Sequence, residues 1–239
     1  LATRLFIKEQ FGLMFKEMIE EYQVREYLKK KQRSISPITL KYEGEYYVME
    51  NGVDFPCGRA DSDEVQQLRH MYGLEDGTPV FMFVGRLLWY KGLKLTFDAL
   101  KILSDKGIAY RMLVIGDGLD REEMEQYVDT IGIRDNVIFT GAVFDREDLR
   151  VFYTAGDLFL FPSLYDTNGI VVREAAACGV ASLLIEGSCA AEGITHGRTG
   201  ILTKDDPEAI AVELEFAASH LDEVRQIQDA GRVGRAKAE

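Results

Sequence analysis

A chain of 239 residues can hold one large domain, or one domain and part of another. Its 46% hydrophobic and 28% charged residues are typical of a folded globular protein, and no apolar run approaches the roughly 20 residues that cross a bilayer. The formal net charge of −12 argues against a general nucleic-acid binder, which needs a basic surface. Small anionic ligands stay open, because a local basic pocket can exist on an acidic protein.

Residues 1–44 predict a helical segment that differs from the rest of the chain. Apolar side chains recur at helical spacing over residues 5–31, and Pro37 follows the end of that pattern. Because one helix cannot bury such a stripe alone, we expect it to pack on the following domain or on a missing part. The basic residues at 29–33 are either a patch for peripheral contact with the inner face of a membrane or the solvated cationic end of the helix. We favour the second, because short charge runs are usually plain surface.

The three cysteines, Cys57, Cys178 and Cys189, lack the spacing of metal ligands. Cys178 follows three alanines on a predicted apolar helix, so we expect a buried thiol that behaves as a small hydrophobe. Reduced thiols predict a cytoplasmic protein. The chain begins at Leu1 without an initiator methionine or a signal-peptide pattern, and we expect it to be a fragment of a longer protein.

From about residue 45 onwards, short apolar runs alternate with amphipathic segments. The apolar runs predict strands at residues 46–49, 80–84, 112–115, 137–140, 158–161 and 182–185. The amphipathic segments predict helices at residues 63–72, 92–106, 121–132, 146–155, 170–178 and 207–220. Continuous apolar strands are buried on both faces, and their alternation with helices is typical of βαβ units. The predicted fold is α/β, a doubly wound, Rossmann-like parallel sheet over residues 45–239, in which ligands bind beyond the carboxyl ends of the strands.

Two cations follow the strand predicted at 80–84. That strand ends at Gly85, Arg86 stands at its tip, and Lys91 stands just before the next helix. Arginine offers a planar fork to phosphate oxygens, and lysine offers a compact point charge. Both residues could be ordinary surface cations, but a lysine at a helix N-terminus is electrostatically unfavourable and so favours a functional explanation.

Small residues follow the next two strands. Ile115-Gly116-Asp117-Gly118 resembles half of a dinucleotide fingerprint, but Arg121 stands where the third glycine would be, so the indication for NAD is weak. Gly116 either forms a plain turn or marks the close approach of a nucleotide, and both interpretations stay open. The loop through Val143 could present backbone groups to the edge of a base; taken alone, it indicates only a turn.

Two carboxylates stand eight positions apart, Asp166 in a predicted loop and Glu174 on the following helix, with Gly169 and Ile170 at the helix entry. A glycine there lets amides at the positive helix end approach an anion. Carboxylates can then accept hydrogen bonds from sugar hydroxyls. Asp166 could instead form a turn, and Glu174 could be an exposed helical residue. The alanines at 175–177 indicate a buried helix, however, on which Glu174 would be costly without a partner.

Acidic and histidine residues elsewhere do not predict a metal site. Asp61-Ser62-Asp63 has the spacing of a metal-binding acidic pair, but it directly precedes Glu64 at the start of a helix, so we predict a helix cap. The histidines lack metal-ligand spacing, and none is expected to be a general base: His70, His196 and His220.

Together, these segments resemble the donor-binding half of the GT-B, family 4 retaining glycosyltransferases (glycosyl transferases group 1). The shared motifs occur in the family's order across residues 48–202: Val84-Gly85-Arg86…Lys91-Gly92, Ile115-Gly116-Asp117-Gly118, Val137-Ile138-Phe139-Thr140-Gly141, Leu160-Phe161-Pro162-Ser163, and the acids Asp166 and Glu174. The Asn-Gly-Val-Asp sequence at 51–54 is also similar to the family's entry into that domain.

The resemblance implies transfer of a hexose from a nucleotide-sugar to an acceptor, with retention of configuration at the anomeric carbon. The expected donor is a UDP-sugar. It implies no metal and no further cofactor, because cations and a helix end neutralise the leaving diphosphate. The residues it assigns to the diphosphate are Arg86, Lys91, Gly169 and Ile170. The catalytic acids it implies are Asp166, beside the donor sugar, and Glu174, on the ribose hydroxyls. The residues it places around the nucleoside are Gly85, Gly116, Val143 and Glu174.

The chain departs from the family pattern in three places. The first acid is usually Glu, and the usual Gly-Phe-Gly after it is Thr167-Asn168-Gly169 here. Residues 1–44 offer only a helical remnant of the acceptor domain, so we expect weak or no transfer by this chain alone. The acceptor, whether polysaccharide, glycolipid or small molecule, stays open. The alternative functions are a nucleotide-sugar epimerase of the same fold and a non-catalytic nucleotide-sugar-binding module, with an NAD dehydrogenase third.

Overall fold

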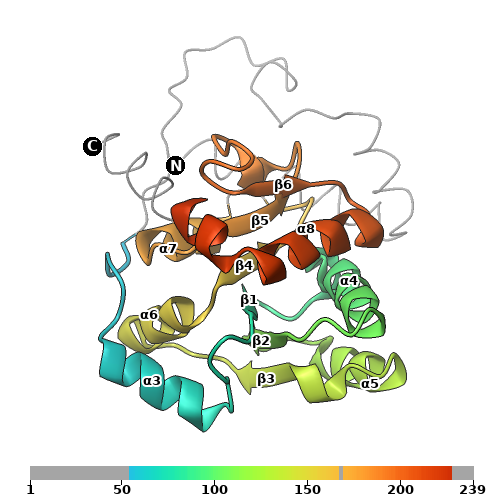
Figure 1. Cartoon of the computed structure of the whole chain (residues 1–239), viewed down its shortest axis with the longest axis horizontal. Coiled ribbons are helices and arrows are strands. Elements are labelled where there is room, and N and C mark those ends of the chain that lie inside the picture. The colour runs from blue at the N-terminus through green and yellow to red at the C-terminus, as the bar shows by residue number, and fades with distance from the viewer. Residues whose placement is uncertain (1–53, 167–168, 228–239) are drawn as a thin grey trace, which may run out of the picture. The chain divides into compact units, whose positions relative to one another are not determined.

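The computed structural model describes residues 54–166 and 169–227, and it confirms the predicted doubly wound α/β fold (Figure 1). The strands are β1 (Val80–Val84), β2 (Arg111–Ile115), β3 (Val137–Gly141), β4 (Leu158–Phe161), β5 (Ser182–Ile185) and β6 (Ile201–Thr203). The α-helices are α3 (Ser62–Met71), α4 (Leu93–Asp105), α5 (Arg121–Thr130), α6 (Arg146–Ala155), α7 (Ile170–Ala177) and α8 (Pro207–Ser219). Three short 3₁₀ turns are η1 (Trp89–Lys91), η2 (Arg134–Asn136) and η3 (Cys189–Ala191). The helix predicted at 5–31, the strand predicted at 46–49 and the expected domain boundary lie outside the described residues.

All strands of this sheet run parallel, in the order β3-β2-β1-β4-β5-β6. Helices α4 and α5 cover one face of the sheet, and α6 and α7 cover the other (Figure 1). Strands β2 and β3 are added in turn on one side of β1. The chain then crosses back to place β4 on the other side of β1, and β5 and β6 follow beyond it. The carboxyl ends of β1 and β4 therefore flank the switch point, where open α/β sheets bind their ligands.

Burial explains why the strand sequences are continuously apolar. Every residue of β1, β4 and β5 is buried, because helices cover both faces of these strands. Aromatic rings add to the packing between β1 and β4, where the centroids of Phe83 and Phe161 lie 6.2 Å apart in a stacked arrangement. The edge strand β3 is less covered, since only Val137 of its five residues is buried.

Cys178 is buried at the end of α7, as predicted, and this burial raises the pKa of its thiol to about 12. Cys57 is exposed. Because the thiolate is the reactive form, we expect Cys57 to react quickly with a thiol reagent at pH 8 and Cys178 to react only on unfolding. Absorbance with an aromatic disulfide reagent measures both phases. Cys57→Ser should abolish the fast phase; loss of a fast-reacting thiol in Cys178→Ser would contradict the prediction.

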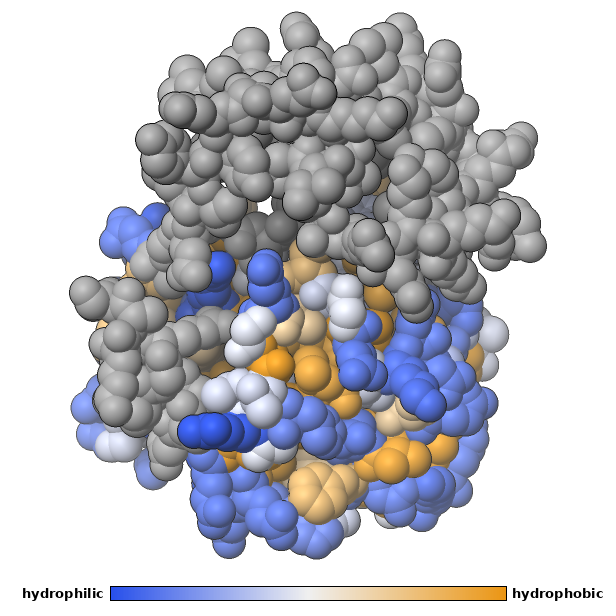
Figure 2. All heavy atoms as spheres, turned by 90° about the horizontal axis from the view of Figure 1, so that it is seen from above, coloured by the Kyte–Doolittle hydropathy of each residue, from blue (hydrophilic) through white to orange (hydrophobic). Residues whose placement is uncertain are grey.

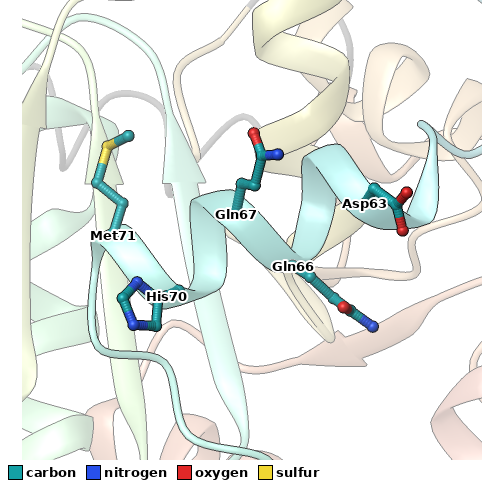
Figure 3. A pocket seen from close by; sticks show the side chains of 5 residues that line it. All are labelled: Asp63, Gln66, Gln67, His70 and Met71. Atoms are coloured by element: carbon teal, nitrogen blue, oxygen red, sulfur yellow. The ribbon is translucent and has the colours of Figure 1, made fainter.

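Helix α3 packs on α6 and confirms the predicted helix cap. The Asp61 side chain accepts a hydrogen bond from the Asp63 backbone amide at 2.9 Å, so Asp61 caps α3. Figure 3 shows a shallow hollow along the exposed side of α3, and all of its lining side chains come from that one helix: Asp63, Gln66, Gln67, His70 and Met71. None of the predicted site residues lines it.

The helices of the described part are at most 13 residues long, and none of them is long and apolar enough to span a membrane.

Candidate functional site

Two helices begin at the switch point without a side-chain cap. Helix α4 starts after Gly92 and α7 starts after Gly169, and both glycines adopt the left-handed conformation. The helices α6 and α8 differ, because Asp145 and Asp206 accept hydrogen bonds from their first-turn amides. In α4 and α7, the positive end of the helix and its first amides thus have no capping side chain within the described residues, an arrangement that suits an anion.

Both of these glycines are needed for close packing as well as for their backbone conformation. A Cβ on Gly92 would lie 2.1 Å from the Pro162 carbonyl oxygen, and one on Gly169 would lie 2.9 Å from the Ala190 Cβ. The start of α4 therefore touches the loop that leads to α7, and the start of α7 touches the segment after β5. These contacts draw the loops following β1, β4 and β5 together at one edge of the sheet.

Lys91 and Asp166 form an ion pair across the switch point. Lys91 ends η1 after β1, and Asp166 stands in the loop after the neighbouring strand β4. Their side chains are only 14% and 19% exposed, and the Lys91 ammonium lies 5.8 Å from the centroid of the Phe161 ring. Because an ammonium group has three N–H donors, Lys91 can hold Asp166 and still donate to an anion.

Arg86 stands exposed in the loop after β1. Its carbonyl accepts a hydrogen bond from the Leu88 amide at 3.0 Å, which closes a tight turn at the strand tip. Among the described residues, the guanidinium of Arg86 has no ion-pair or hydrogen-bond partner. The side chain is therefore available to a ligand at this edge of the sheet.

Glu174 has the partner that its position on a packed helix requires. Its Oε2 accepts a hydrogen bond of 3.1 Å from the hydroxyl of Tyr153, a buried residue of α6. Burial raises the pKa of Glu174, while the Tyr153 hydrogen bond and the charge of Arg146 oppose that rise. Glu174 is only partly buried, and its carboxylate can accept further hydrogen bonds. Tyr153 was not among the predicted site residues, because no local pattern links it to Glu174, 21 positions away.

Glycines also join the strand ends that are expected to flank a nucleoside. The Gly85 amide donates to the Ile115 carbonyl at 3.0 Å, and the Gly116 amide donates to the Gly141 carbonyl at 2.9 Å. A Cβ on Gly116 would lie 1.9 Å from the Gly85 carbonyl oxygen. These glycines therefore allow the loops after β1, β2 and β3 to touch, which supplies a structural reason for Gly116 whether or not a nucleotide lies there.

The loop after β3 turns one apolar side chain inward and the next outward. Val143 is partly buried against the core, whereas Phe144 is 92% exposed. Leu119, in the loop after β2, is also 92% exposed. Figure 2 shows apolar surface among the hydrophilic residues on one face of the described part. Val143 itself can thus offer a ligand its backbone more readily than its side chain.

The switch point of this doubly wound sheet thus brings together two helix ends that lack a side-chain cap among the described residues, two cations and two acids, a combination typical of sites for anionic ligands. The model of the family described as glycosyl transferases group 1 matches residues 64–233, which is more than half of the chain. The chain belongs to this family.

Curated relatives carry several transferase and synthase names. The chain is 32% identical over 183 residues to 2-deoxystreptamine glucosyltransferase of Streptomyces kanamyceticus, a match that covers 70% of this chain and 47% of the relative. It is 31% identical over 164 residues to mannosylfructose-phosphate synthase of Agrobacterium fabrum, with coverages of 65% and 36%. The chain thus spans less than half the length of these relatives.

Solved structures share the fold. HepE of Anabaena, in a complex with UDP and glucose, superposes with a TM-score of 0.67 at 22% identity, covering 75% of this chain and 49% of that one. The C-terminal domain of the group 1 glycosyl transferase LpcC of Francisella tularensis superposes with a TM-score of 0.66 at 22% identity, covering 78% of this chain and 97% of that domain.

Proposed function

We propose that this chain forms the nucleotide-sugar-binding part of a retaining, GT-B family 4 glycosyltransferase that uses a UDP-sugar. The observation that carries the proposal is the pair of helix N-termini at the switch point that lack a side-chain cap among the described residues, with Lys91 directly before the first and paired with Asp166 in the loop before the second. A nucleotide-sugar combines a diphosphate with two sets of hydroxyl groups, and the cations, amides and acids at this edge match those groups. The complexes of HepE with UDP and glucose and with UDP-glucose support this choice of ligand.

The proposed roles follow from the chemistry of each side chain. As the bond between sugar and phosphate breaks, negative charge grows on the departing diphosphate, and preorganised cations and amides stabilise that charge. The groups proposed for this role are Arg86, Lys91 and the amides of Gly169 and Ile170. Asp166, held by Lys91, would lie beside the donor sugar, and Glu174 would accept hydrogen bonds from the ribose. The loops at Gly85, Gly116 and Val143 would border the nucleoside. Acceptor recognition is proposed to lie outside the described residues.

Thermal unfolding in the presence of UDP-, GDP- and ADP-sugars tests the proposal. A ligand that binds only the folded state stabilises it by about 2.7 kcal/mol at a concentration of 100 times its Kd. UDP-sugars are expected to raise the midpoint of unfolding, and the absence of a shift with every nucleotide-sugar would overturn the proposal. NMR of the products made by a longer protein that includes this chain would then separate hexose transfer with retention from epimerisation. Binding without turnover would favour a non-catalytic module.

Affinity for UDP-glucose is expected to fall on the acid side of neutrality. Glu174 must be ionised to accept hydrogen bonds from the ribose, and burial raises its pKa above the ordinary 4.5, so its proton is retained to a higher pH. The groups facing it are the Tyr153 hydroxyl, the Arg146 guanidinium and the thiol of Cys178. Calorimetry across pH measures this loss, which should be absent in Glu174→Gln. If Glu174→Gln loses the same affinity at low pH as the wild type, the titrating group is a residue other than Glu174.

A further inference from the structure

We propose that Tyr153 is a positioning residue that fixes the carboxylate of Glu174 for the ribose; the inference rests on the proposed function. Tyr153 is completely buried in the last turn of α6, and its hydroxyl reaches α7. The ring makes edge-on contacts with Phe55 and with Phe159 of β4, at centroid distances of 5.8 Å and 5.7 Å. Because packing fixes the ring, the position of the hydroxyl is fixed as well.

The hydroxyl faces two acceptors on α7. It lies 3.1 Å from Oε2 of Glu174 and 3.3 Å from the Val171 carbonyl oxygen. A phenol carries one proton, so these two acceptors share one donor, and the nearer one is the charged group that binds it more strongly. The two acceptors are three residues apart, less than one helical turn. Tyr153 therefore links α6 to the first turns of α7.

This contact leaves one carboxylate oxygen open. With Oε2 held by Tyr153, Oε1 of Glu174 has no hydrogen-bond partner among the described residues and can accept from a ribose hydroxyl. A free glutamate side chain samples several rotamers and loses that freedom on binding. Tyr153 lowers this entropic cost of binding, because it holds the Glu174 carboxylate in one orientation before the ligand arrives.

The matched variant is Tyr153→Phe, which removes only the hydroxyl and keeps the buried ring. Calorimetry on the 239-residue chain compares UDP with 2′,3′-dideoxy-UDP, which has the same base and diphosphate but lacks the ribose hydroxyls. Tyr153→Phe is expected to weaken UDP binding about tenfold and to leave 2′,3′-dideoxy-UDP binding unchanged. In a Glu174→Gln background, Tyr153→Phe should cause no further loss, because the two residues act as one unit.

Tyr110→Phe is the control for loss of a buried phenol hydroxyl. Tyr110 is 2% exposed and directly precedes β2, so it lies at the amino end of that strand. The candidate site lies at the carboxyl ends of the strands, and this variant should therefore bind both ligands normally. Glu174→Asp is a second test that leaves Tyr153 intact; the shorter side chain draws the carboxylate away from the hydroxyl, and the same selective loss is expected.

Three results would overturn the inference, and they can be told apart. Equal weakening of UDP and 2′,3′-dideoxy-UDP in Tyr153→Phe would show that the hydroxyl supports the start of α7 generally. Unchanged UDP affinity in Tyr153→Phe, beside a loss in Glu174→Gln, would reject the positioning role while the ribose role of Glu174 stands. Unchanged affinity in Glu174→Gln would reject the ribose role, and the positioning inference with it.

Discussion

Replacing Lys91 by alanine is expected to weaken UDP-glucose binding by about 1.5–3 kcal/mol, the range for hydrogen bonds to charged groups. The Lys91 side chain is only 14% exposed, so its interaction with a diphosphate is less screened than at an open surface. Its removal also leaves Asp166 without its cation beside the anionic ligand. The loss should therefore fall near the upper end of this range. Calorimetric titration of the 239-residue chain measures it directly.

Two further variants separate the causes. Lys101→Ala removes a cation of α4 that pairs with Asp105 at the far end of that helix, and it should leave binding unchanged. The double variant Lys91→Ala, Asp166→Asn removes the unpaired acid and should recover part of the loss. Wild-type affinity in Lys91→Ala would exclude Lys91 from the diphosphate site.

The second large effect concerns stability. Gly116→Ala is expected to lower the free energy of unfolding by about 3 kcal/mol or more, because two costs combine. The φ of Gly116 is +140°, which L-residues rarely adopt, and the new Cβ would lie 1.9 Å from the Gly85 carbonyl oxygen. Backbone on both sides must move to relieve this clash. Urea unfolding followed by circular dichroism gives the free energy.

Gly107→Ala is the matched control for this prediction. Gly107 also has a positive φ, +72°, but nothing lies within 4 Å of the Cβ that alanine would add. Its expected cost is about 1 kcal/mol, from backbone strain alone. If both variants lose the same free energy, the contact between the loops after β1 and β2 does not constrain Gly116.

Much of the fold was predictable because burial on both faces imposes continuous apolar strands. The predicted limits of β1, β4 and β5 match the structure for this reason. Strand β6 was missed: Ile201–Thr203 contains three residues, too few to show a period or a distinct apolar run. The helix limits agree within two residues, since the acidic caps and glycines that bound the helices are visible in the sequence.

The sequence named the residues of the candidate site, whose roles remain predictions, but it did not reveal their contacts. The family motifs named Lys91, Asp166 and Glu174, yet the ion pair of the first two joins positions 75 apart. The hydrogen bond from Tyr153 to Glu174 likewise depends on how α6 and α7 pack on the sheet. Such pairs follow from tertiary structure, and a single sequence contains no local signal for them. Placing ligand groups against Arg86, Gly116 and Val143 remains a prediction.

A crystal structure of the chain with UDP-glucose would test most directly whether the switch-point edge is the nucleotide-sugar site. We expect the diphosphate to lie between the starts of α4 and α7, within hydrogen-bond distance of Arg86, Lys91 and the amides of α7, with a ribose hydroxyl on Glu174. Density for the nucleotide anywhere else, such as along the hollow of α3, with the switch-point edge empty would contradict it.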